Sequence, residues 1–269
     1  MPDNRLPTRV KPDFPILILS LEGDERRRAP LLQKLDDLGL EYQVFHGVDG
    51  RKGLPPEYES KVDRVAAQKN NRRFLGDSEL AASLSHHEIY RHIVENSLPG
   101  AIILEDDAIL LDAFEGFVKR GEYRPYDMAL LDHEEARVLR KPVMKADGYL
   151  VYRLFNHQMW QFTYRATGYS LSQKGAQYML SVTTPVQDVP DWPGDITTIG
   201  AVALHPHVVD RPDPLTGVSH LRDDRDASFA AGLEPPEVIR KRRLRFFSAA
   251  YWRRWWLKRG YPRPWIKIS

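Results

Sequence analysis

The sequence predicts an α/β fold with a mostly parallel central sheet flanked by helices. Short apolar runs, typical of buried strands, alternate along the chain with segments of helical periodicity, and this alternation favours a parallel sheet. Two of the apolar runs end directly in acidic residues. Ligands of such sheets bind beyond the carboxyl ends of the strands, so these acids mark a candidate site.

The first three elements follow one another closely. Residues 14–20, Phe-Pro-Ile-Leu-Ile-Leu-Ser, predict a fully buried first strand. Residues 24–38 predict a helix, because leucines recur there at helical spacing, and Gly39 is suited to end it. The alternating segment 41–46 predicts a second strand, followed by a turn at 48–50.

The middle of the chain repeats this order. Residues 76–96 predict a longer helix that carries three histidines, and residues 101–104 predict a short buried strand. That strand runs straight into Glu105, Asp106 and Asp107. Another buried strand is expected at 128–131, and it ends in Asp132 and His133.

The composition excludes several kinds of site. The chain has no cysteine, which excludes disulfides, zinc–thiolate sites, iron–sulfur clusters and cysteine nucleophiles. Any metal must therefore be bound by oxygen or imidazole. There is no Gly-rich phosphate loop and no Gly-x-Ser-x-Gly elbow, so P-loop kinases and α/β-hydrolases are not leading candidates.

The charge distribution divides the chain into a body, residues 1–233, and a basic aromatic tail, residues 234–269. Residues 240–269 hold 11 of the 39 Lys and Arg and none of the 37 Asp and Glu, so the preceding residues carry 28 basic against 37 acidic groups. Leu244, Phe247, Tyr251 and Trp255 form one apolar stripe at helical spacing. This pattern favours a helix on an anionic membrane surface, and the alternative is a helix packed on the body.

No uncharged apolar run is long enough to span a bilayer, and no secretion signal opens the chain. The expected location is therefore the cytoplasm, on the inner face of the cytoplasmic membrane. A nucleic-acid partner is not expected, because the acidic body would repel phosphate backbones.

The acidic motif Glu105–Asp107 is the sharpest local signal. Three adjacent acids repel one another unless a cation neutralises them, and an oxygen cluster suits Mg²⁺, Mn²⁺ or Ca²⁺. In extended backbone Glu105 and Asp107 would project to one side and share the ion, and His207 could complete the shell. The alternative is that the acids cap a helix beginning near Ala108.

Several ordered segments resemble glycosyltransferase family 25, which includes bacterial lipooligosaccharide β-galactosyltransferases. The resemblance covers roughly residues 16–219. Ile102 to Asp107 resembles the family's "iiLEDD", and Asp188 to Trp192 resembles its late "P.Dw" element. The other matching segments are Ile16–Leu21 with Glu25-Arg26-Arg27, Val44–Gly50, Leu75–Glu79 with Ser83–His86, and Thr167–Ala176.

The resemblance implies a nucleotide-sugar (GT-A-like) fold, a UDP-sugar donor, and a divalent ion, Mn²⁺ or Mg²⁺, at the acidic motif. It implies inversion of the anomeric centre, with Asp191 as the first choice of base, Asp188 as the second and Asp195 as a third. The acceptor is expected to be a lipid-linked or lipooligosaccharide saccharide. The implied donor-side residues are Ser20, Leu21, Arg26, Asp49, Ser85, His86 and Asp106.

Alternatives to these assignments remain open. The late acids could simply make turns, Arg26 could pair with an acid, and Ser85 and His86 could anchor a buried helix. At the level of function, a metal-dependent phosphohydrolase would also use an acidic strand end, with Asp132 and His133 as further ligands.

Overall fold

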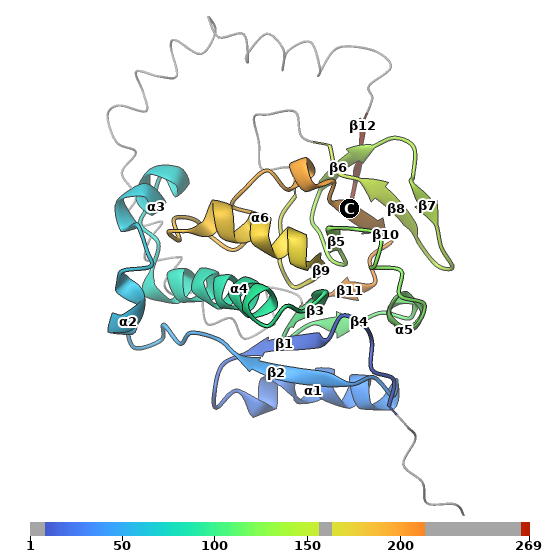
Figure 1. Ribbon diagram of the computed structural model, residues 1–269, viewed down its shortest axis with the longest axis horizontal. Coiled ribbons are helices and arrows are strands. Elements are labelled where there is room, and N and C mark those ends of the chain that lie inside the picture. Colours follow the sequence, from blue (N-terminus) through green and yellow to red (C-terminus); the bar gives the residue numbers. More distant parts are fainter. Residues whose placement is uncertain (1–8, 156–162, 213–264) are drawn as a thin grey trace, which may run out of the picture.

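The computed structural model describes residues 9–155, 163–212 and 265–269, and these form the α/β fold that the sequence predicts. An eight-stranded sheet has the order β2-β1-β3-β9-β5-β10-β8-β7 (Figure 1). Its strands are β1 (Ile16–Ser20), β2 (Tyr42–His46), β3 (Gly100–Glu105), β5 (Met128–Leu130), β7 (Met144–Lys145), β8 (Leu150–Arg153), β9 (Gly168–Ser172) and β10 (Val202–His205). Six of the eight strands run in one direction, because only β9 and β8 are antiparallel to the rest.

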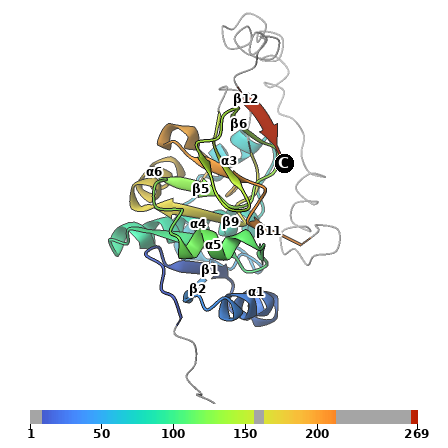
Figure 2. The same cartoon turned by 90° about the vertical axis from the view of Figure 1, so that its right-hand side faces the viewer.

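Helices cover both faces of this sheet. The described helices are α1 (Glu25–Asp37), α2 (Pro56–Glu59), α3 (Arg64–Asn71), α4 (Asp77–Glu95), α5 (Ala113–Lys119), α6 (Gln173–Thr183) and the 3₁₀ turn η1 (Ile196–Ile199). Helices α4 and α6 pack on one face, and α1 and α5 pack on the other. Figure 2 shows α4 and α6 to one side of the strands and α1 to the other.

The side chains of β1 and β3 alternate between the two resulting cores. Leu17 and Ile103 belong to the core under α4 and α6, whereas Ile18 and Leu104 belong to the core under α1 and α5. Successive strand residues point to opposite faces, so an apolar run buried on both faces is what a central strand needs. Helix α1 ends at Asp37, and Gly39, the expected stop signal, follows the cap residue in the left-handed conformation with φ +64°.

No helix begins at Ala108, so the alternative in which the acidic motif caps a helix there is wrong. After a turn at 106–107 the chain forms the short strand β4 (Ile109–Leu110), which pairs with β11 (Val209–Asp210). The next helix, α5, starts only at Ala113. Pairing with β11 therefore decides the local structure that follows the acids, and Ile109 lies opposite Asp210.

The last residues of the predicted tail belong to the body. Strand β12 (Trp265–Ile268) pairs antiparallel with β6 (Ala136–Leu139), and Ile268 is buried in the core under α4 and α6. The segment predicted to contact a membrane lies outside the described residues. Within the described residues, no helix is long and apolar enough to cross a membrane.

Candidate active site at the carboxyl edge of the sheet

The carboxyl ends of four parallel strands bring polar side chains to one edge of the sheet. Ser20 ends β1, Glu105 ends β3, Asp132 follows β5 and His205 ends β10. Between β3 and β5 lies the antiparallel β9, so Thr167 and Arg165, which precede that strand, reach the same edge. The topology thus gathers into one region residues that lie far apart in the sequence.

The acidic motif is held to β1 and α1 by its second and third members. Ser20 donates a hydrogen bond from Oγ to Oδ2 of Asp106 at 2.8 Å, and Arg27 Nε lies 3.0 Å from Asp106 Oδ1. Arg27 Nη2 donates to Oδ2 of Asp107 at 2.6 Å. Within the described residues, Oδ1 of Asp107 is buried and accepts no hydrogen bond. A buried carboxylate oxygen without a hydrogen-bond partner is a candidate ligand atom for a metal ion.

The first member of the motif turns to a different partner. Glu105 Oε1 lies 3.5 Å from Nε2 of His86 on α4, and about a third of its side chain is exposed. Glu105 and Asp107 thus contact different elements, whereas Asp106 and Asp107 share Arg27. Glu105 and Asp107 were expected to project to the same side, but their contacts place them against different partners. The reason is that a turn at 106–107 interrupts the extended backbone.

Burial and charge act in opposite directions on these acids. Burial raises the pKa of Asp106, and the attraction of Arg27 and the bond from Ser20 only partly offset it. Burial also opposes ionisation of Glu105, but His86, Arg27 and Arg211 more than compensate and lower the pKa of Glu105. At this edge the carboxyl of Asp106 resists ionisation, and the neighbouring carboxyl of Glu105 favours it. Such perturbed pKa values are common at functional sites.

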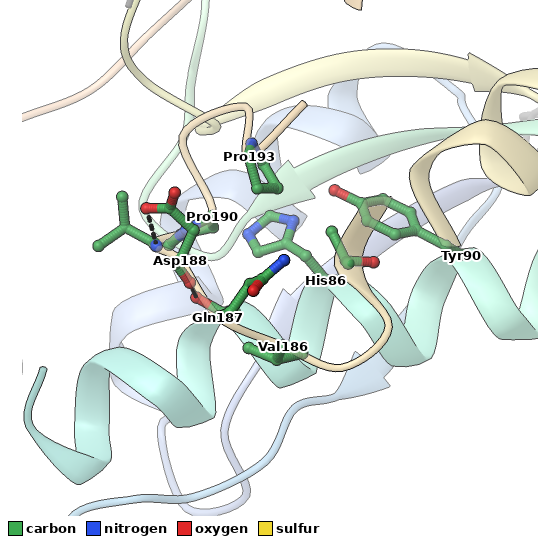
Figure 3. A pocket seen from close by; sticks show the side chains of 10 residues that line it. His86, Tyr90, Val186, Gln187, Asp188, Pro190 and Pro193 are labelled. Atoms are coloured by element: carbon green, nitrogen blue, oxygen red, sulfur yellow. Dashed lines mark hydrogen bonds between the residues drawn. The ribbon is translucent and has the colours of Figure 1, made fainter. Parts of the chain in front are cut away.

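His86 links the acidic motif to a small recess in the protein. Its Nδ1 lies 2.8 Å from the hydroxyl of Tyr169, which in turn lies 3.4 Å from the hydroxyl of Tyr90. Figure 3 shows His86 and Tyr90 on one side of the recess and Gln187, Asp188 and Pro190 on the other. The recess has room for about one water molecule, which is too little for a sugar ring.

A second cluster of ligand atoms lies at the ends of β5 and β10. Among the described residues, Asp132, His207 and Asp210 form a group whose ligand atoms all lie within 4.8 Å of one another and could hold a metal ion. Neither Glu105 nor Asp107 belongs to such a group in this part of the chain. His207, expected to join the acidic motif, thus lies instead with Asp132 and Asp210.

Arg165 contacts both carboxylates of the second cluster. Its Nη1 lies 3.1 Å from Asp132 Oδ1 and 3.6 Å from Asp210 Oδ1, and its Nε lies 3.4 Å from Glu134 Oε2. Asp132 is fully buried, and burial raises its pKa although Arg165 acts against this. Its Oδ2 has no hydrogen-bond partner among the described residues, so this oxygen is available to a cation.

The other donor-side candidates have mostly structural contacts. Ser85 is buried, accepts from the backbone N–H of Val48 at 2.8 Å and donates to the carbonyl of Ala81, which anchors the 47–50 turn to α4. Asp49 is exposed and pairs with Arg51, and the Leu21 carbonyl accepts from Arg28.

Arg26, the arginine singled out from the sequence, is exposed, and the acids are bound instead by the next residue. Adjacent residues of a helix point in directions about 100° apart, so only one of the two arginines can face the motif.

The three candidate bases have different surroundings. Asp188 lines the recess and accepts from the backbone N–H of Val189 at 2.9 Å, and burial raises its pKa. Asp191 is half-buried and directly precedes Trp192, whose buried ring packs edge-on against Tyr169. Asp195 caps the 3₁₀ turn through the backbone N–H and hydroxyl of Thr197, which is a structural role.

Several site residues were not singled out from the sequence. Arg27, Arg165, Tyr169 and Asp210 all contact the predicted acids or histidines. Arg27 and Tyr169 stand inside family-like segments, which was a usable signal. Asp210 and Arg165 had none, because only the pairing of β4 with β11 and the antiparallel β9 bring them to this edge.

Comparison with known proteins is consistent with this arrangement. The model of a family described as "Glycosyltransferase family 25 (LPS biosynthesis protein)" matches residues 14–197. That span includes the acidic motif, the helix that carries His86 and all three candidate bases. The cluster residues His207 and Asp210 lie beyond it.

Curated relatives match at low identity. "Procollagen galactosyltransferase 2" of Mus musculus is 24% identical over 172 residues, which cover 61% of this chain and 27% of that protein. A "Glycosyltransferase 25 family member" of Anopheles gambiae is 29% identical over 111 residues, 40% of this chain and 18% of that protein. "Inactive glycosyltransferase 25 family member 3" of Mus musculus is 25% identical over 179 residues, 62% of this chain and 28% of that protein. The chain spans about a quarter of the length of the curated relatives it matches.

Proposed function

The chain belongs to glycosyltransferase family 25, and on that premise we propose that it transfers a sugar, with galactose favoured, from a UDP-sugar to a hydroxyl of a saccharide acceptor. One observation carries this proposal. At the carboxyl ends of β1 and β3, the buried Asp106 is fixed by Ser20 and Arg27, and the neighbouring Asp107 keeps a buried oxygen without a partner in the described residues. The galactose preference is supported by the relatives named procollagen galactosyltransferase 2.

The donor is proposed to bind at this edge together with a divalent cation, Mn²⁺ or Mg²⁺. The second cluster, Asp132, His207 and Asp210, is the proposed cation site, and Asp107 of the acidic motif is the proposed further ligand when the donor is bound. Their chemistry fits, because both clusters present a buried carboxylate oxygen with no partner among the described residues. The pairing of β4 with β11 joins the two clusters. When bound, the cation would offset the negative charge that gathers on the leaving UDP.

The protein groups of this edge have proposed roles in binding the donor. Arg27 now neutralises Asp106 and Asp107, and it would be a positive group close to the diphosphate. Glu105 would contact the donor from beside His86. Ser20, the last residue of β1, holds Asp106 in place and would contact the donor at the end of that strand.

The transfer is proposed to invert the anomeric centre. An aspartate takes the proton of the acceptor hydroxyl as that oxygen bonds to the anomeric carbon, and the bond from this carbon to the UDP oxygen breaks on the opposite face. Asp191 remains the first choice for this base, with Asp188 second. Of the three candidates, Asp188 is the one that lines the recess beside His86, the residue that contacts Glu105, so the recess supports the second choice rather than the first.

The acceptor is proposed to be lipid-linked or part of a lipooligosaccharide, reached at the inner face of the cytoplasmic membrane. The basic aromatic composition of residues 240–264 supports contact with anionic lipid. Flotation of the full chain with anionic vesicles tests this, and added salt should release the protein, because charges are screened beyond about 8–10 Å at physiological ionic strength. Binding that depends on neither lipid charge nor salt would contradict it.

Thermal shift separates this function from a nucleic-acid partner and from the phosphohydrolase alternative, which no observation favours. A ligand that binds only the folded protein stabilises it by about 2.7 kcal/mol at a hundred times its dissociation constant. We expect UDP with Mn²⁺ to raise the melting temperature by several degrees, and an oligonucleotide or phosphate at the same concentration to leave it unchanged. A rise with phosphate alone would favour the phosphohydrolase.

A further inference from the structure

His207 has two ring nitrogens, and they face different groups. Its Nε2 lies 3.4 Å from Nδ1 of His133, while its Nδ1 lies 3.8 Å from Oδ1 of Asp132. Only a nitrogen with an unprotonated lone pair can bind a metal ion. Whether His207 can serve the cluster with Asp132 and Asp210 therefore depends on which nitrogen carries the proton.

His133 settles the position of that proton. It is fully buried, and its Nε2 lies 2.9 Å from the carbonyl oxygen of Leu204. A carbonyl only accepts, so Nε2 of His133 must carry a proton. In the neutral ring Nδ1 is then an acceptor, and His207 pairs with it only by donating from Nε2. The lone pair of a neutral His207 is thereby left on Nδ1, which faces Asp132.

The contacts of the two rings favour a neutral His133. Its Nε2 proton already meets the carbonyl oxygen of Leu204, and a second proton on Nδ1 would face the N–H of His207, so the two rings could not form a hydrogen bond. The geometry therefore favours the neutral arrangement, in which His207 donates and His133 accepts.

We propose that His133 is a positioning residue that holds His207 with its Nδ1 lone pair directed at a divalent cation shared with Asp132 and Asp210. This inference rests on the proposed function only in requiring a cation at this edge of the sheet. A metal-bound histidine whose second nitrogen donates to a fixed acceptor is held in one orientation and one tautomer. One imidazole with two carboxylates suits Mn²⁺ better than Ca²⁺ or Mg²⁺, which prefer oxygen ligands.

Arg165 gives this cluster a counter-ion when no metal is bound. Its guanidinium contacts Asp132 and Asp210, the same two carboxylates that the cation would use. The cation and Arg165 therefore compete for negative charge. Arg165→Gln removes the positive charge that competes with the cation, so it is expected to tighten Mn²⁺ binding. His207→Ala removes a ligand and is expected to abolish Mn²⁺ binding.

The experiment measures Mn²⁺ binding to the full chain without nucleotide, by calorimetry. We expect His133→Leu to weaken Mn²⁺ binding by about 10- to 100-fold, which is typical for loss of a group that orients a metal ligand. His133→Gln should bind Mn²⁺ within a few-fold of the wild type, because an amide offers one donor for Leu204 and one acceptor for His207. His92→Leu is the matched control, since His92 lies in the last turn of α4 and outside the cluster, and it should leave Mn²⁺ affinity unchanged.

The outcomes separate this inference from the proposed function. If the wild type binds Mn²⁺ and His133→Leu binds it equally well, the positioning role is overturned and the cation site stands. If the folded wild type binds no Mn²⁺, the proposed cation itself is overturned. Should His133→Leu fail to fold, the nitrogen-15 spectrum of His207 in the wild type decides between the two tautomers. A proton on Nε2 of His207 would support the positioning role of His133, and a proton on Nδ1 would contradict it.

Discussion

Replacing Asp107 with alanine is expected to abolish sugar transfer and cation-dependent UDP binding while the protein stays folded. The transfer rate should fall by at least about 100-fold, the typical effect of removing a group that stabilises charge in the transition state. Folding should survive, because Asp107 is a quarter exposed and Arg27 keeps its contact with Asp106. Turnover and UDP calorimetry with and without Mn²⁺ measure the two effects.

Two further variants sharpen that result. Asp107→Asn keeps the shape of the side chain and removes its charge, so it should behave like the alanine variant if charge is what matters. Asp112→Ala removes a nearby exposed acid outside the motif and should leave turnover unchanged. Full transfer by Asp107→Ala would mean that the acidic motif does not bind the donor.

The second large effect is expected from Asp191→Asn. The amide keeps the shape of the side chain but cannot take the proton of the acceptor hydroxyl, so transfer should fall by about 10² to 10⁴ while UDP affinity is unchanged. Asp188→Asn and Asp195→Asn are the comparison variants. Asparagine caps a helix turn about as well as aspartate, so Asp195→Asn should be nearly neutral given the bonds to Thr197.

The pattern of losses assigns the base. If Asp188→Asn separates turnover from UDP binding and Asp191→Asn does not, the choice of residue is wrong although the inverting mechanism stands. Burial raises the pKa of Asp188, which favours this carboxylate as a proton acceptor. If none of the three variants loses transfer, the mechanism itself fails.

Local patterns predicted the elements that are decided locally. The buried strands and the helix at 24–38 follow from apolar runs, leucine spacing and the glycine at the helix end, and all lie where expected. The acids were placed at a strand end for the same reason. The antiparallel strand β9 was not predicted, because its position between β3 and β5 depends on pairing with segments more than 30 residues away.

The site was only partly predictable. Glu105 lies at a strand end and Asp106 and Asp107 follow it directly, as the apolar run before them indicated, but the contact of Glu105 with His86 was not predicted. The partner arginine could not be chosen, because the sequence shows three consecutive arginines and only the helix geometry selects Arg27. Asp132, His207 and Asp210 come from three separate segments, so no spacing rule could bring them together.

The most direct test of the central claim is turnover with a panel of nucleotide sugars, since one relative is named inactive and family membership alone does not establish catalysis. The purified full chain is incubated with Mn²⁺ and each donor, with and without a saccharide acceptor, and released nucleotide is measured. We expect UDP release from a UDP-sugar, UDP-galactose above the others, stimulated by acceptor and lost with a chelator or in Asp107→Ala. Nucleotide release from no donor, or release that is unchanged in Asp107→Ala, would contradict the account.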